Sequence, residues 1–180
     1  MKKSAIILLL LMSVSVFSQK LYTKTGLTEF KASVEAFEPV EAKNNSTTVL
    51  LNTENGDIAA LLFVKAFSFR VALMQEHFNE NYMDSNKFPK ATFKGKIKGF
   101  NMSEISESKE YPISGTLTVR GVDKKIETTG KFAKKGNKLH LVAQFSVKPE
   151  DFEIKIPKIV SKKIAGTINV TLDYELIEKK

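Results

Sequence analysis

The stretch Leu139-His140-Leu141-Val142-Ala143-Gln144-Phe145-Ser146-Val147 decides the fold class of this chain. Every odd-numbered position in it is apolar, and three of the four even-numbered positions are polar. Because successive side chains of a strand point to opposite faces of a sheet, this period of two predicts a β-strand with one buried face. The last stretch of the chain, Ile164 to Ile177, shows a similar apolar face and predicts a second strand.

The same alternation recurs along the rest of the chain, in segments joined by short turns. Asn55-Gly56 is a dipeptide that favours the positive backbone angles of a tight hairpin turn. Short connections suit antiparallel neighbours, so the sequence predicts an all-β protein. Periodicity alone leaves a sandwich and a closed barrel both open. The eight predicted strands are Phe30 to Ala36, Thr47 to Asn52, Ile58 to Val64, Ala91 to Ile97, Tyr111 to Arg120, Lys125 to Ala133, Leu139 to Val147 and Ile164 to Ile177.

One segment, residues 68–83, breaks the alternation and predicts a short amphipathic helix on or across the sheet. Ser68 is the expected N-cap, and Phe88-Pro89 restores extended backbone after the helix. At about 100° per residue, apolar and aromatic side chains gather on one face. That face combines the rows Leu73, His77, Asn81 and Met74, Phe78, Tyr82.

The first eighteen residues have the three parts of a secretory signal. Lys2 and Lys3 are followed by an apolar run from Ala5 to Met12 and then by small residues, which predicts cleavage before Gln19. An uncleaved anchor is the alternative, but the segment is short of the roughly 20 apolar residues of a spanning helix. We therefore expect a signal peptide at 1–18 and a single domain at 19–180, with no membrane span in the mature chain.

The composition argues against metal, disulfide and catalytic chemistry. The chain has no cysteine, and its two histidines are His77 and His140. A thiolate or histidine cluster for zinc is therefore missing, and so is a Gly-x-Ser-x-Gly nucleophile elbow. We expect no metal, no cofactor and no enzymatic activity. We expect His77 to be partly buried on the apolar face of the helix. An enzyme that uses His77 in catalysis is the alternative hypothesis.

The net charge is +8, from 28 Lys and Arg against 20 Asp and Glu. Without Lys2 and Lys3 the balance is 26 minus 20, or +6. The positive charge is spread over lysines, and Arg70 and Arg120 are the only arginines. Nucleic-acid binding is not expected, because clustered arginines and stacking aromatics on a sheet are lacking. A looser attraction to anionic headgroups or phosphates remains open.

Phenylalanine is in surplus, with Phe 13, Tyr 4 and Trp 0. These rings either fill a solid core or line a cavity, and the sequence pattern does not choose between the two. A solid-cored module that binds a partner through its exterior is therefore an alternative to a binding protein with a hollow interior.

Four strings are more specific than the general pattern. They are Leu73-Met74-Gln75-Glu76-His77-Phe78-Asn79-Glu80-Asn81-Tyr82-Met83, Phe88-Pro89-Lys90-Ala91-Thr92-Phe93-Lys94-Gly95, Gly115-Thr116-Leu117-Thr118-Val119-Arg120-Gly121-Val122 and Asp151-Phe152-Glu153-Ile154. From Thr28 to the C-terminus the chain resembles the YceI-like family of exported lipid-binding proteins. Val122-Asp123-Lys124 departs from the family's commoner Val-Thr-Lys at a turn.

The resemblance implies an eight-stranded, antiparallel, lipocalin-like barrel with the helix near its mouth. It also implies a non-enzymatic protein, periplasmic or secreted, that binds and transports or stores a polyisoprenoid or other lipid-like amphiphile. The oligomeric state stays open, with a homodimer among the options. Arg120 or a nearby lysine is expected to meet a phosphate or polar head. The expected ligand-binding residues are Phe67, Phe69, Leu73, Met74, Phe78, Tyr82, Phe93, Leu117, Val119, Arg120 and Phe145.

Overall fold

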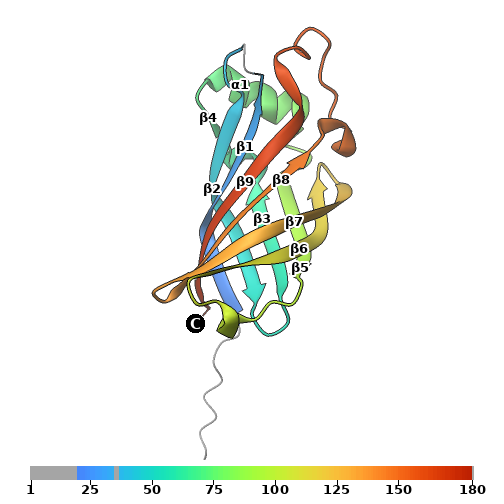
Figure 1. The fold of residues 1–180 in the computed structure, drawn as a ribbon. Helices are drawn as coiled ribbons and strands as arrows, with labels where there is room; N and C mark the ends of the chain where they lie inside the picture. Colours follow the sequence, from blue (N-terminus) through green and yellow to red (C-terminus); the bar gives the residue numbers. More distant parts are fainter. Residues whose placement is uncertain (1–19, 35–36, 180) are drawn as a thin grey trace, which may run out of the picture.

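The computed structural model describes residues 20–34 and 37–179. The expected signal peptide and its cleavage site lie outside these residues. Within them, eight antiparallel strands close into a barrel in the order β1-β9-β8-β7-β6-β5-β3-β2, with β2 pairing back to β1 (Figure 1). The strands are β1 Lys20–Ser33, β2 Glu41–Asn52, β3 Asp57–Phe63, β5 Lys90–Ile97, β6 Ser108–Val119, β7 Val122–Lys135, β8 Lys138–Val147 and β9 Ile164–Glu178. The predicted eight-stranded antiparallel barrel is confirmed.

Strand β1 starts at Lys20, well before the predicted start at Phe30. Its buried positions run Leu21, Thr23 and then Gly26, Thr28, so the alternation changes phase. The pairing of β1 with β2 shifts register between Thr23 and Gly26, as at a β-bulge. An extra residue in one strand reverses which positions face inward. The first half of β1 therefore escapes a search for unbroken alternation.

The helical insertion is shorter than predicted. Helix α1 covers Ala72–His77 and continues into a π-helical turn, η2, at Phe78–Tyr82. Ser68 and Phe69 form the two-residue strand β4 on the edge of β2, so Ser68 is not the N-cap. Val71 occupies that position, and the Gln75 side chain accepts a hydrogen bond from the Phe69 backbone N–H at 3.2 Å. Three short 3-10 turns complete the fold: η1 Val64–Ala66, η3 Met102–Glu104 and η4 Pro149–Phe152.

The two ends of the barrel differ. Helix α1 and the β8–β9 connection, residues 148–163, lie at one end, which we call the mouth end (Figure 1). The β2–β3 and β7–β8 turns and the loop carrying η3 lie at the opposite, closed end, beside the end of β9. No helix in the described part of the chain is both long and apolar enough to cross a bilayer.

Tightly packed side chains fill the lumen at the closed end. The rings of Phe100, Tyr111 and Phe132 contact one another with centroids 5.4 to 5.7 Å apart. Ile97, Leu139 and other apolar residues pack around this aromatic trio, and most of them are almost fully buried. This half of the barrel is a solid core, and the burial of its apolar side chains stabilises the fold.

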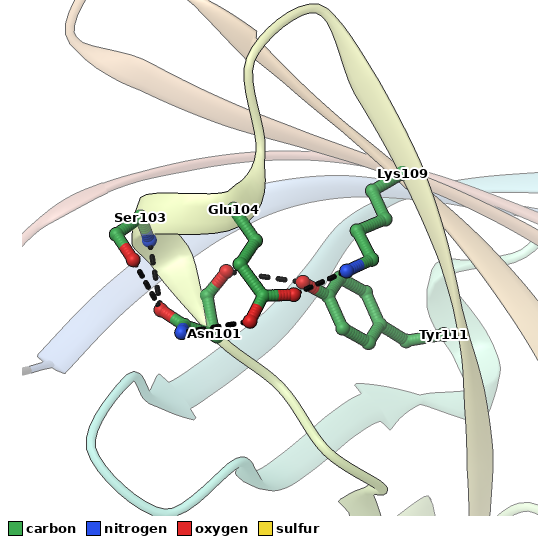
Figure 2. Close-up of polar contacts among 5 residues, drawn as sticks. All are labelled: Asn101, Ser103, Glu104, Lys109 and Tyr111. Carbon is green, nitrogen blue, oxygen red and sulfur yellow. Dashed lines mark hydrogen bonds and ion pairs between the residues drawn. The ribbon is translucent and has the colours of Figure 1, made fainter.

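Polar contacts fix the loop that covers the closed end (Figure 2). Asn101 accepts hydrogen bonds from the backbone N–H and hydroxyl of Ser103, and its amide donates to Glu104. Tyr111 donates its hydroxyl to the Asn101 carbonyl at 3.0 Å. The hydrogen bond from Lys109 lowers the pKa of Glu104, and the same bond raises the pKa of Lys109. These contacts hold the loop over the buried Ile105.

We predict that Phe132→Ala destabilises the protein by about 3 to 5 kcal/mol, because it leaves a cavity in a packed core. Phe145→Ala, at an inward position of β8 nearer the mouth end, is the control and should cost roughly 1 kcal/mol, since its ring has fewer neighbours to lose. Urea unfolding monitored by circular dichroism measures both values. Equal losses would contradict the division of the lumen into a solid and a hollow half.

Candidate functional site

The mouth half of the barrel contains a cavity of about 420 Å³. Each of the nine strands contributes side chains to its wall, including Phe69 of the two-residue β4, and α1, η2 and the β8–β9 connection cover it. The exposed residues His77 and Lys163 are part of the lining, so the cavity opens to solvent between α1 and the β8–β9 connection. Most of the other lining side chains are apolar, so the wall is chemically suited to an apolar molecule.

Three hydroxyl groups form a polar layer at the floor of the cavity. Thr28 Oγ1 lies 2.8 Å from Thr47 Oγ1 and 2.9 Å from the Tyr174 hydroxyl. All three side chains are buried and satisfy one another, which offsets the cost of placing them inside the barrel. Burial raises the pKa of Tyr174 to about 12, so the phenol is neutral at physiological pH.

Gly26 makes room for this layer. A Cβ atom at position 26 would lie 2.6 Å from the Tyr174 ring and 3.0 Å from the Thr47 carbonyl oxygen. Any larger residue would push the tyrosine away from Thr28. The glycine therefore sets the depth at which Tyr174 closes the cavity.

Phe93 lies along the wall and leaves the lumen open. Its ring covers Gly95 and Gly115, which face each other across β5 and β6, and a Cβ on either glycine would lie about 2.5 Å from the ring. Leu117, Val119 and Phe145 point inward but are only half-buried, because they border empty space. Gly95 and Gly115, which belong to two of the four specific strings, thus leave room for the Phe93 ring to lie flat against the wall.

A second aromatic cluster, separate from the trio at the closed end, forms the wall below the helix. Phe30, Phe67, Phe69 and Phe78 come from β1, the η1–β4 segment and η2, with ring centroids 5.0 to 5.8 Å apart. Edge and stacked contacts of this kind add to the stabilisation from burial. The cluster attaches the helix to β1 and gives the cavity an aromatic rim.

The structure brings nine of the eleven predicted ligand-binding residues together on the cavity wall. Leu73 is not among them, and its side chain is 57% exposed. The helix begins at Ala72 and directs Met74 and Phe78 inward, which leaves Leu73 about 100° away from that face. The nine are Phe67, Phe69, Met74, Phe78, Tyr82, Phe93, Leu117, Val119 and Phe145.

Arg120 is also absent from the cavity wall. It occupies the β6–β7 turn with φ 50°, and its guanidinium donates to the Glu153 carbonyl at 2.8 Å. The same group lies 5.7 Å from the centroid of the Phe88 ring. Arg120 therefore ties the turn to the β8–β9 connection. Lys163 is the cationic residue that borders the cavity.

Much of the lining was not identified from the sequence. The inward face of β9 contributes Ile168, Val170 and Leu172, and the β8–β9 connection adds further apolar residues. The alternation in β9 indicates an inward face, but it does not reveal which part borders the empty half of the barrel. The residues from the connection are Pro149, Phe152, Ile154, Ile156 and Val160.

The two histidines differ in their surroundings. His77, predicted to be partly buried, is exposed at the cavity opening. His140 lies on the outer face of β8, where its Nε2 is 2.7 Å from the Asp173 carboxylate. In the part of the chain that the structure describes, no group of three or more histidines and carboxylates is placed to hold a metal ion.

Comparison with known proteins relates this barrel to a family. The sequence model of the YceI-like domain matches residues 13–176. A polyisoprenoid-binding domain from Saccharophagus degradans, implicated in plant cell wall breakdown, has a TM-score of 0.76 at 12% identity, covering 89% of this chain and 99% of its own. Burkholderia cenocepacia BcnA has a TM-score of 0.68 at 15% identity, and the match covers 83% of this chain and 95% of BcnA. The Campylobacter jejuni YCEI protein has a TM-score of 0.64 at 18% identity, and the match covers 80% of this chain and 88% of that protein. No curated protein matches.

We predict that Tyr174→Phe costs about 1 kcal/mol of stability near pH 8, because Thr28 loses one hydrogen-bond partner. The raised pKa of Tyr174 gives this difference a pH dependence. The stabilisation that favours the neutral phenol is fully present below its ordinary pKa of 10.0 and is lost as pH rises through about 12.

The stability of the wild type relative to Tyr174→Phe should therefore fall by about 2 to 3 kcal/mol between pH 10 and pH 12. Urea unfolding of both proteins over this range isolates the effect, since other groups titrate equally in the two. A difference that stays constant with pH would contradict the buried position of the phenol.

Proposed function

The chain belongs to the YceI-like family, and from that premise we propose that it binds one long apolar chain, a polyisoprenoid or a similar amphiphile, inside the mouth half of the barrel. The observation that carries the proposal is the apolar cavity of about 420 Å³, closed below by the hydroxyl layer and open beside the helix. Its volume falls in the range of about 300 to 1,000 Å³ that is usual for ligand pockets.

The energetics support an apolar ligand. Each buried methylene contributes about 0.8 kcal/mol. Ten such groups would offset much of the roughly 4 to 15 kcal/mol that association costs. The lining has few polar atoms, so the wall would supply affinity and little discrimination between apolar chains. Phe93, Leu117, Val119 and Phe145 would contact the buried part of the chain.

A polar head would remain at the opening of the cavity. Lys163 and His77 lie there and are exposed, whereas Arg120 is engaged with Glu153. We propose Lys163 as the residue that meets a phosphate or other anionic head. In this orientation the head stays in water and the apolar chain runs down toward Tyr174, which agrees with the cost of burying a charge.

The proposed role is binding, and with it transport or storage, without catalysis. The half-open cavity supports this role because an apolar chain inside it is shielded from water while its head stays accessible for transfer. The basic, apolar and small-residue sequence of the first eighteen residues supports export, and the family resemblance supports a periplasmic location.

We predict that Leu117→Trp abolishes uptake of an apolar chain, because the larger ring fills the lumen. Leu73→Trp, the same substitution at an exposed site outside the cavity, is the matched control and should leave uptake unchanged. Native mass spectrometry after incubation with a C15 to C50 prenyl series, together with lipid extraction of freshly purified protein, measures occupancy.

Two results would contradict the proposal. One is the repeated recovery of ligand-free wild-type protein that takes up neither prenyl nor acyl chains. The other is equal loss of uptake in Leu117→Trp and Leu73→Trp while both variants keep the circular dichroism spectrum of the wild type.

A further inference from the structure

The β8–β9 connection combines exposed lysines with an exposed isoleucine beside the opening of the cavity. Residues 153–163 read Glu-Ile-Lys-Ile-Pro-Lys-Ile-Val-Ser-Lys-Lys, which gives four lysines minus one glutamate, a charge of +3. Ile154, Ile156 and Val160 point to the cavity, whereas Ile159 points away from it and is 88% exposed.

The lysines of this stretch are not engaged with the rest of the protein. Lys155, Lys158 and Lys162 are exposed, and within the described residues their ammonium groups form no ion pair or hydrogen bond. The neighbouring acidic residues do not neutralise them. Asp151 is paired with Lys124 at 2.6 Å, and Glu150 with Lys148 at 3.6 Å. Their charge is therefore available to an external anion.

Exposed apolar side chains concentrate at the same end of the barrel. Of the five large apolar residues that are exposed in the described chain, four lie on elements of the mouth end, namely the β1–β2 connection, the end of β3, α1 and the β8–β9 connection (Figure 1). Ile177, near the end of β9, is the exception. The four are Phe37, Phe63, Leu73 and Ile159. Several exposed apolar side chains at one end indicate a contact surface, since scattered exposure would carry no such preference.

We propose that residues 153–163 dock on an anionic bilayer surface, with the lysines among the lipid headgroups and Ile159 inserted at the boundary of the acyl chains. Basic residues next to an inserted apolar side chain are the recognition elements of peripheral membrane binding. Because Lys163 and Val160 also border the cavity, docking would turn the opening toward the bilayer.

This orientation has a consequence that rests on the proposed function. An apolar chain could pass between the bilayer and the cavity without crossing bulk water. Docking itself does not depend on the cargo, because it involves Lys158, Ile159 and Lys162, whose side chains lie outside the cavity wall.

Cosedimentation with vesicles tests the docking surface. The protein is purified from cells after any processing that the cells carry out. It is then mixed, at low salt, with vesicles made of phosphatidylcholine alone or of phosphatidylcholine with about one third phosphatidylglycerol. We expect binding to the anionic vesicles and little to the neutral ones. Lys158→Gln with Lys162→Gln should lower the partition coefficient by roughly fivefold per lysine. Ile159→Ser should lower it by roughly tenfold.

The matched control carries the same charge change at the closed end, Lys98→Gln with Lys134→Gln, and should bind like the wild type. Equal binding to both kinds of vesicle, no binding to either, or equal losses in the two lysine pairs would overturn the docking surface. Such results would point to a protein partner or to no partner at the connection. They would leave ligand uptake, measured by native mass spectrometry, unaffected.

Discussion

The hydrogen bonds that join Thr28, Thr47 and Tyr174 are the constraint on which the two halves of the barrel depend. Hydroxyl groups inside an apolar lumen are tolerated only when they satisfy one another. On one side of this layer, Leu139 and Leu176 belong to a packed core; on the other side the lumen is open. Gly26 leaves the space in which Tyr174 can reach the threonines.

The division separates stability from binding. An eight-stranded barrel is just wide enough either to be filled by side chains or to hold one slender ligand, and this barrel does each in one half. The aromatic trio around Phe132 stabilises the closed end, so Leu117 and Val119 are free to border empty space. A ligand that fills this space would add to the stability of the folded state in proportion to its affinity and concentration.

Alternation along the chain predicted all eight barrel strands, although it missed the first halves of β1 and β2, and the short specific strings were sufficient to predict the family. Alternation did not reveal that half of the lumen is hollow, because Leu139 and Phe145 follow the same pattern on β8 although Leu139 belongs to the packed core and Phe145 borders the cavity. The position of a residue along the barrel axis depends on the pairing of strands that are distant in the sequence. The same limit explains why Leu73 was misplaced, since the orientation of the helix depends on the contact of Phe78, at the start of η2, with the distant Phe30. It also explains Arg120, since its partner Glu153 is distant in sequence.

The central claim is that a ligand occupies the mouth half of the lumen and not the closed half. Isotope-filtered NMR spectra of the methyl-labelled protein with an unlabelled apolar chain test it most directly. We predict intermolecular nuclear Overhauser effects to Leu117, Val119 and Val170, and none to Leu51 or Leu176. Effects confined to exterior methyl groups such as those of Leu73 and Ile177, or no effects at any inward methyl, would contradict the account.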